Sequence, residues 1–127
     1  EPLFRSRSTL KSNGVKLAVC TNKPDIAAKG MVEHIFGKDT FDIIQGAVDG
    51  FPKKPDPSVP RRILAKLGIS ADETVWIGDS DVDIISAHNL GCKSIGVTWG
   101  FRSRESIETD KPNAMVNKTE EILNFFK

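Results

Sequence analysis

The sequence predicts an α/β fold built on a parallel sheet, and two observations lead to this prediction. Short apolar runs of strand length, at residues 15–20, 41–45 and 75–77, alternate with longer segments whose apolar residues recur at helical spacing. Polar residues follow directly after some of these strands, as is typical of ligand sites at the carboxyl ends of parallel strands. The alternation favours a doubly wound sheet with helices on its faces.

The most informative stretch is residues 74–91, where a short apolar run of the kind seen in buried parallel strands leads to Asp79 at the strand end. Asp81 and Asp83 lie in the first turn of the helix that follows. The helix macrodipole favours acidic residues there, which accounts for Asp81 and partly for Asp83, but not for Asp79. Carboxylates as close as Asp79 and Asp83 repel unless a cation lies between them, and hard oxygen ligands suit Mg²⁺. We therefore expect a metal site in this loop.

The composition bounds the kind of protein. With 127 residues the chain forms one domain at most, and 18 basic against 17 acidic residues give a net charge of +1. No basic field indicates nucleic acid or an anionic membrane as a partner, and no apolar run approaches 18 residues. With no signal peptide evident, we expect a cytoplasmic protein in which Cys20 and Cys92 are reduced core cysteines.

The helices are predicted from apolar spacing and from stop signals. One runs over 24–36, with Pro24 in its first turn. Others cover 59–67, with Gly68 as the stop, and 81–90, with Gly91 as the stop. Asn117 and Glu120 indicate a last helix to Phe126. The helical stripe in 24–36 consists of Ile26, Ala27, Met31, Val32 and Ile35.

Further strands are predicted at residues 94–98 and at Ala114–Val116. The proline-rich stretch 50–57 can be neither helix nor central strand and is expected to be a loop. Residues 1–9 show no clear period and are expected to be irregular, and 10–14 fit the last turn of a helix that Gly14 caps.

Three loops combine into one candidate site, because strand ends that feed helices lie on one edge of such a sheet. They carry Thr21-Asn22, Lys54 and the Asp79–Asp83 pair. A hydroxyl with backbone N–H groups, an ammonium and two carboxylates suit a phosphoryl group with Mg²⁺.

Each residue also has a simpler interpretation. Thr21 could be the N-cap of the next helix, and Lys54 could be a solvated lysine like its neighbour Lys53. His34 and His88 are expected on the surface, and Trp99 is expected to serve packing.

The motifs resemble those of the haloacid dehalogenase superfamily. The resemblance rests on Val-Cys-Thr21-Asn22-Lys-Pro, Lys54-Pro-Asp-Pro and Gly-Asp79-Ser-x-x-Asp83, which match motifs two, three and four in order and spacing. Additional similarity to the phosphoglycolate phosphatase branch lies in Leu-Lys-Ser-Asn-Gly, Lys-Leu-Gly-Ile and Gly-Val-Thr-Trp-Gly. Membership implies a Rossmann-like core, Mg²⁺ and hydrolysis of a phosphomonoester through an aspartyl-phosphate. It implies that Thr21 and Asn22 hold phosphate oxygens, that Lys54 neutralises them, that Asp79 binds Mg²⁺, and that Asp83 supports the metal and the lysine.

One departure from the family pattern concerns its first motif, Asp-x-Asp followed by Gly and Thr or Val, which does not occur in these 127 residues. That motif supplies the nucleophile and the acid/base on the central strand, and the helical cap that selects substrate follows it. We therefore expect residues 1–9 to be an N-terminal remnant and 10–127 to be the C-terminal part of a phosphatase core. The parallel sheet should be incomplete, with a gap or a foreign segment between the strands at 15–20 and 75–77.

Three functional hypotheses follow from the resemblance. The leading one is a Mg²⁺-dependent phosphatase acting on a small phosphorylated metabolite such as phosphoglycolate. The first alternative is a phosphosugar mutase of the same family. The second is that these residues alone form a non-catalytic phosphate- or Mg²⁺-binding piece, to which a second chain or segment could supply the missing strand.

Overall fold

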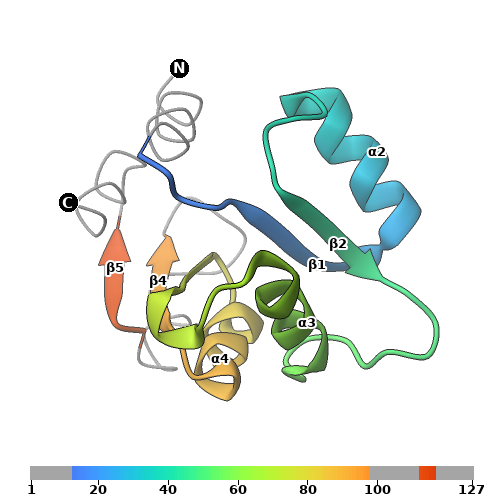
Figure 1. Cartoon of the computed structure of the whole chain (residues 1–127). Helices are drawn as coiled ribbons and strands as arrows, with labels where there is room; N and C mark the ends of the chain where they lie inside the picture. Colours follow the sequence, from blue (N-terminus) through green and yellow to red (C-terminus); the bar gives the residue numbers. More distant parts are fainter. Residues whose placement is uncertain (1–12, 98–111, 117–127) are drawn as a thin grey trace.

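The structure is a computed structural model that describes residues 13–97 and 112–116. Helices and strands alternate along the chain, as the sequence predicts (Figure 1). In chain order they are β1 (Ala18–Pro24), α2 (Asp25–Phe36), β2 (Ile43–Ala47), α3 (Ser58–Leu67), the 3-10 turn η1 (Ala71–Glu73), β3 (Val75–Gly78), α4 (Asp81–Leu90), β4 (Lys93–Val97) and β5 (Ala114–Val116).

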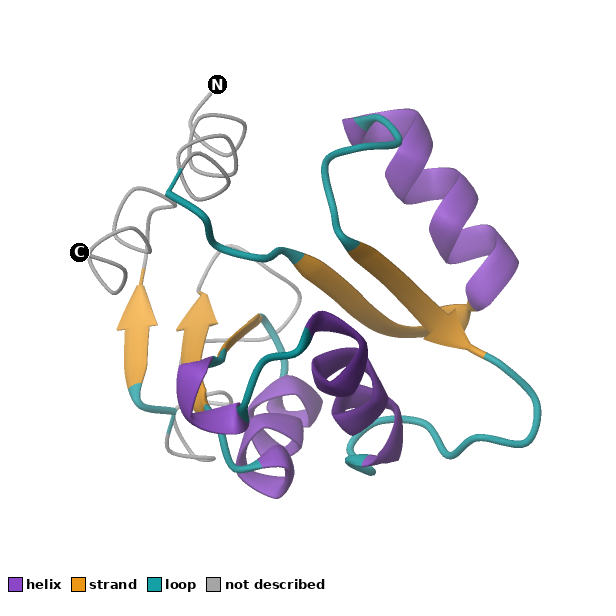
Figure 2. Cartoon of the chain, viewed as in Figure 1, coloured by secondary structure: helices purple, strands orange, loops and turns teal. Residues whose placement is uncertain are grey.

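The strands form two separate parallel sheets in the described residues. One has the order β1-β2 and the other the order β3-β4-β5, and every pairing is parallel. Figure 2 shows α2 beside β1 and β2, with α3 on the other side of this pair. The strands β1 and β3 are not hydrogen-bonded to each other. The predicted fold, an α/β parallel sheet interrupted between these two strands, is thus confirmed.

The largest boundary error concerns β1. We expect a strand over 15–20 that ends at Thr21-Asn22, whereas β1 starts at Ala18 and continues to Pro24 with an irregular register after Cys20. Pro24 is consequently the N-cap of α2 rather than a residue of its first turn. The alternative role of Thr21 as a helix N-cap is therefore wrong. β2 is also displaced, from 41–45 to Ile43–Ala47.

The later elements agree closely with prediction. α4 has the expected bounds, and Gly91 ends it in the left-handed conformation (φ 86°), as Gly68 ends α3 (φ 69°). Ser80 is the N-cap of α4, and its hydroxyl accepts the Asp83 backbone N–H at 3.3 Å. The strand predicted at 94–98 spans Lys93–Val97, and β5 matches its prediction.

The core is concentrated around β4 and α4. Ile95 and Val97 are buried between β3 and β5, and Leu64 of α3 packs against Ala87 and Leu90 of α4. By contrast β3, expected to be a buried strand, leaves Ile77 39% exposed. The physical reason is that β3 has a strand neighbour on one side only among the described residues.

The apolar stripe of α2 is only partly buried. Val32 is buried, as is Ala28, which lies outside the predicted stripe, whereas Met31 and Ile35 are 44% and 60% exposed. Ile26, at 89%, points away from the core. Apolar spacing identified the helix correctly, but it did not identify the face that packs on β1 and β2.

Single residues outside the candidate site mostly follow expectation. His34 and His88 are exposed, and both cysteines are free thiols, with Cys92 buried and Cys20 half-buried. Within the described ranges no helix is long and apolar enough to cross a membrane. The predictions for residues 1–9, for the turn at 10–12, for Trp99 and for the helix beginning at Asn117 lie outside the described residues.

Candidate functional site

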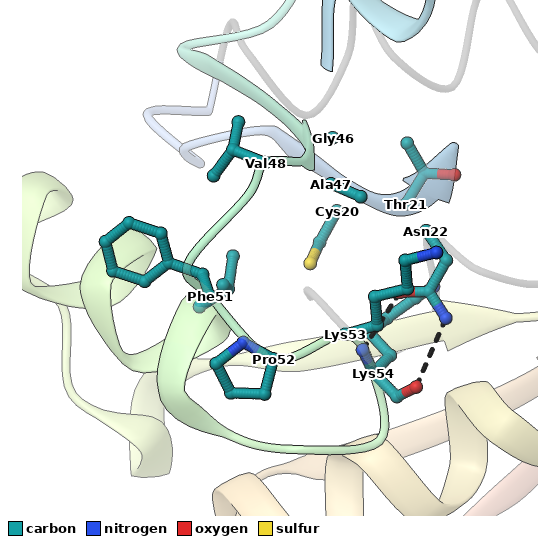
Figure 3. Close-up of a pocket in the computed structure, with 11 residues that line it drawn as sticks. Cys20, Thr21, Asn22, Gly46, Ala47, Val48, Phe51, Pro52, Lys53 and Lys54 are labelled. Atoms are coloured by element: carbon teal, nitrogen blue, oxygen red, sulfur yellow. Dashed lines mark hydrogen bonds between the residues drawn. The ribbon is translucent and has the colours of Figure 1, made fainter. Parts of the chain in front are cut away.

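The backbone of Lys54 is held by the side chain of Asn22. The Asn22 amide donates to the Lys54 carbonyl at 3.1 Å, and its oxygen accepts the Lys54 N–H at 2.9 Å (Figure 3). Both residues are partly buried, so losing this pair would leave two backbone groups poorly satisfied. The family resemblance implies that Asn22 holds phosphate oxygens. In the structure Asn22 lies at the site, but its side-chain amide is hydrogen-bonded to the backbone of Lys54. Lys54 belongs to the segment between β2 and α3, residues 48–57, which is called the lysine loop below.

The side chain of Lys54 forms an ion pair with Asp83. Its ammonium lies 2.9 Å from Asp83 Oδ1, and the two side chains are only 12% and 13% exposed. Lys53 is exposed. The sequence distinguishes the two lysines only by their distance from Pro55. In the structure they differ in burial, and Lys54 is paired with Asp83.

Both oxygens of the Asp83 carboxylate accept hydrogen bonds. Trp76 donates its indole N–H to Oδ1 at 3.2 Å, and Ser80 donates its hydroxyl to Oδ2 at 3.0 Å. The carboxylate folds back over Gly78, where an added Cβ would lie 2.2 Å from the Asp83 Cβ. Gly78 is therefore required by close packing, not only by the turn that the sequence indicates.

The lysine loop contacts both sheets. Asn22 belongs to β1, whereas Asp83 belongs to α4, which packs on β3 and β4. Near the end of α4, Asn89 donates its side-chain amide to the Pro55 carbonyl at 2.9 Å. The Lys54-Pro55 peptide bond is cis. These contacts bring Asn22, Lys54 and Asp83 together, one residue from each of the three predicted segments.

A pocket lies along the middle of β1 and beside the end of β2. It is lined by Cys20, Thr21 and Asn22, by Gly46 and Ala47 of β2, and by Lys54 with neighbouring loop residues (Figure 3). The Thr21 hydroxyl accepts the Lys23 N–H at 3.2 Å, and in Figure 3 it points away from the Cys20 thiol. Burial raises the pKa of the Cys20 thiol above its usual 9.0, although the charge of Lys54 opposes this. Cys20 therefore lines the pocket, and its thiol is a poor nucleophile.

Asp25, the first residue of α2, connects the start of this helix to β2. Its Oδ1 accepts the Gly46 N–H at 2.8 Å and the Gln45 amide at 3.3 Å, and its Oδ2 pairs with Lys29 at 2.7 Å. A Cβ on Gly46 would lie 2.5 Å from the Asp25 Cα. Neither this connection nor the contacts of Trp76 and Asn89 were predicted from the sequence. A buried indole needs an acceptor, which was the one available signal for Trp76, while nothing in sequence singles out Asn89.

Asp79 and Asp83 are the candidate metal ligands. Asp79 follows β3 directly and is half-buried, and Asp81 is the first residue of α4, as expected for a residue that serves the helix N-terminus. Within the described ranges no group of three or more His, Cys, Asp or Glu residues could hold a metal ion by itself. Two carboxylates nevertheless suit Mg²⁺, which usually keeps several waters and takes one or two protein carboxylates.

A parallel α/β fold of this kind belongs to the class of proteins that bind ligands at the carboxyl ends of their strands. Residues 7–97 match the family model of haloacid dehalogenase-like hydrolases. The chain therefore belongs to this family, which confirms the resemblance drawn from its motifs.

Individual relatives agree. The chain is 37% identical over 114 residues to a phosphoglycolate phosphatase of Pectobacterium atrosepticum, an alignment that covers 90% of this chain and 49% of that protein. Among solved structures it resembles a provisionally named phosphoglycolate phosphatase from Lactobacillus delbrueckii subsp. bulgaricus, with a TM-score of 0.90, 35% identity, and coverage of 95% of this chain and 50% of that one. It also resembles a provisionally named beta-phosphoglucomutase from Thermotoga maritima, with a TM-score of 0.84, 25% identity, and coverage of 98% and 57%. The chain thus spans about half the length of the curated relatives it matches.

Proposed function

We propose that the full-length protein is a cytoplasmic, Mg²⁺-dependent phosphatase that hydrolyses a small phosphorylated metabolite such as phosphoglycolate. The observation that carries the proposal is the partly buried pairing of Lys54 with Asp83, close to Asn22 and its neighbour Thr21. Family membership and the names of the relatives support it. In this proposal residues 10–127 form the C-terminal part of the phosphatase core, residues 1–9 being the remnant of what precedes it, and an aspartyl-phosphate forms on a nucleophile outside these 127 residues.

The residues of this chain bind and neutralise the phosphoryl group. We propose that Lys54 offsets the negative charge on its oxygens and that Thr21 contributes a polar contact. Asn22 has its side-chain amide committed to Lys54. Its effect on phosphate binding should therefore run mainly through the position of the lysine. Asp83, by accepting from Lys54 Nζ, orients the ammonium.

The proposed Mg²⁺ ligands are Asp79, directly, and Asp83, in a supporting role. Asp83 already accepts from Lys54, Trp76 and Ser80, which favours Asp79 as the stronger contributor. When bound, Mg²⁺ would offset the repulsion between the phosphate and the surrounding carboxylates.

The test compares Asp79→Asn with Asp81→Asn in the full-length protein. We expect Asp79→Asn to lower phosphate release about 100-fold or more and to weaken Mg²⁺ activation, because metal-borne stabilisation is worth several kcal/mol and each 1.36 kcal/mol is tenfold in rate. Asp81→Asn should retain most activity. The measurements are Mg²⁺ titration of activity over a panel of phosphomonoesters, and thermal unfolding of both variants. Release of phosphate from none of the panel would reject the proposal. The reverse order of the two variants would reject the metal assignment.

Two alternatives have specific support. The likeness to the Thermotoga maritima protein favours a phosphosugar mutase, which would transfer phosphate to a second sugar hydroxyl instead of water. The absence of the Asp-x-Asp-Gly motif from this sequence favours a non-catalytic phosphate- or Mg²⁺-binding role for these residues alone, with a second chain or segment completing the sheet. Product analysis with a sugar phosphate tests the first. The intact mass of the expressed protein tests the second alternative. A mass that requires an upstream segment carrying the Asp-x-Asp motif would eliminate it.

A further inference from the structure

The Trp76 side chain contacts both members of the Lys54–Asp83 pair. Its indole N–H donates to Asp83 Oδ1 at 3.2 Å, and this is the same oxygen that accepts from the Lys54 ammonium at 2.9 Å. The ammonium also lies 5.6 Å from the centre of the Trp76 ring, within the range in which an aromatic face attracts a cation. A tryptophan within an apolar strand is ordinarily a packing residue. These contacts indicate that Trp76 has a role besides packing.

The position of the Lys54 ammonium depends on how Asp83 is held. A lysine side chain is a flexible four-carbon stem, so its charge is located by what it binds. Asp83 is fixed at both oxygens, through Trp76 at Oδ1 and Ser80 at Oδ2. The side chains of Lys54 and Asp83 are 12% and 13% exposed, so water competes weakly and each charged hydrogen bond has more influence.

The indole is itself held in place by the core. Trp76 packs against the cluster of Ala87, Leu90 and Cys92, which joins α4 to the start of β4. Packing on this cluster fixes the ring and thereby aims its N–H at the carboxylate. We propose that Trp76 is a positioning residue that holds Lys54 and Asp83 in one arrangement through its N–H and its ring. The inference rests on the proposed role of Lys54 in phosphate binding.

The test uses two variants that differ by one hydroxyl. Trp76→Phe keeps an aromatic ring and removes the donor, whereas Trp76→Tyr keeps a ring with a donor at its tip. In the full-length protein, acetylation by N-hydroxysuccinimidyl acetate, followed by peptide mass spectrometry, reports how firmly Lys54 is held, and exposed Lys53 serves as the internal standard. We expect the Lys54/Lys53 labelling ratio to rise about threefold to tenfold in Trp76→Phe, as for the loss of one hydrogen bond of ordinary net strength, and to rise less in Trp76→Tyr.

A role in packing alone predicts different results. It predicts a lower midpoint of thermal unfolding in both variants with an unchanged labelling ratio at temperatures where each is folded, and that outcome would overturn the inference. A second measurement keeps the native ring. With every other tryptophan, including Trp99, replaced by Phe, Lys54→Met should change the emission of Trp76, whereas Lys53→Met should not. Equal emission in the two variants would also overturn it.

The labelling ratio separates this inference from the proposed function, because acetylation requires no turnover. A protein that releases phosphate but whose Lys54 labelling is indifferent to Trp76 contradicts the inference alone. A protein whose labelling responds as expected, yet which hydrolyses no phosphomonoester, contradicts the phosphatase proposal alone.

Discussion

Asp83 makes more of the side-chain contacts in the site than any other described residue. Lys54, Trp76 and Ser80 all donate to its carboxylate, and Gly78 lies directly beneath it. The geometry requires a residue without a side chain at position 78, because any Cβ would overlap the Asp83 side chain. A small change there should therefore disturb both stability and the ion pair.

Gly78→Ala is expected to destabilise the chain by about 1–3 kcal/mol, the usual range for overpacking. The added Cβ would lie 2.2–2.5 Å from Asp83 atoms, so the carboxylate must move. Gly30→Ala is the matched control, because the same added methyl on α2 has no atom within 4 Å. That control should be neutral or stabilising by about 0.5–1 kcal/mol through helix propensity. Urea unfolding of both variants measures the difference, and equal midpoints would contradict the packing argument.

At the scale of elements, the lysine loop is held from β1 by Asn22 and from α4 by Asn89. Asn22→Ala should destabilise the chain by about 1–3 kcal/mol, because it removes the partners of the Lys54 N–H and C=O groups in a partly buried place. The Lys54 amide should then exchange with solvent faster. Asn89→Ala removes one exposed bond to Pro55 and should leave that amide protected. Amide exchange followed by NMR tests this, and equal exchange rates in the two variants would contradict the assigned clamp.

The contacts between α2 and β2 should make the unfolding free energy of the chain depend on pH in the acid range. The hydrogen bond from Lys29, with a further one from the Gly46 N–H, lowers the pKa of Asp25 below its ordinary 3.8. A carboxyl whose pKa is lower in the folded state contributes stability above its unfolded pKa, and this stability is lost as pH falls through the folded pKa. The difference in unfolding free energy between the native chain and Asp25→Asn should therefore be largest above about pH 4 and shrink below it. Urea unfolding between pH 2 and 7 measures it, and a difference that does not vary with pH would refute the argument.

At the scale of the whole molecule, the two sheets are joined within the described residues through side chains and loops, not through a strand ladder. β4 lies between β3 and β5 and contains Ile95, which is 1% exposed, whereas β1 and β3 each have a described strand partner on one side only. We expect amides of β4 to exchange most slowly and those of β1 to exchange markedly faster, because local opening follows burial and ladder contacts. Hydrogen exchange with mass spectrometry on the 127-residue chain measures this. Protection of β1 equal to that of β4 would indicate that β1 has a partner on its open edge.

The sequence alone determined the order and type of the described strands and α-helices, the family, and the meeting of Asn22, Lys54 and Asp83. Those properties depend on local periodicity and on residues with restricted backbone roles, such as Gly68, Gly91 and the prolines of 50–57. The sequence did not determine where β1 ends, because polar residues such as Thr21 and Asn22 can continue a strand as well as stop it.

Only the tertiary structure decided that the Asn22 side chain is committed to the backbone of Lys54 and that the Trp76 indole reaches Asp83. It also decided which face of α2 is buried. The physical reason is the same in each case. These outcomes depend on what lies across from a side chain, over separations of 7 to 32 residues along the chain, and local pattern carries no information about a partner that only folding brings near.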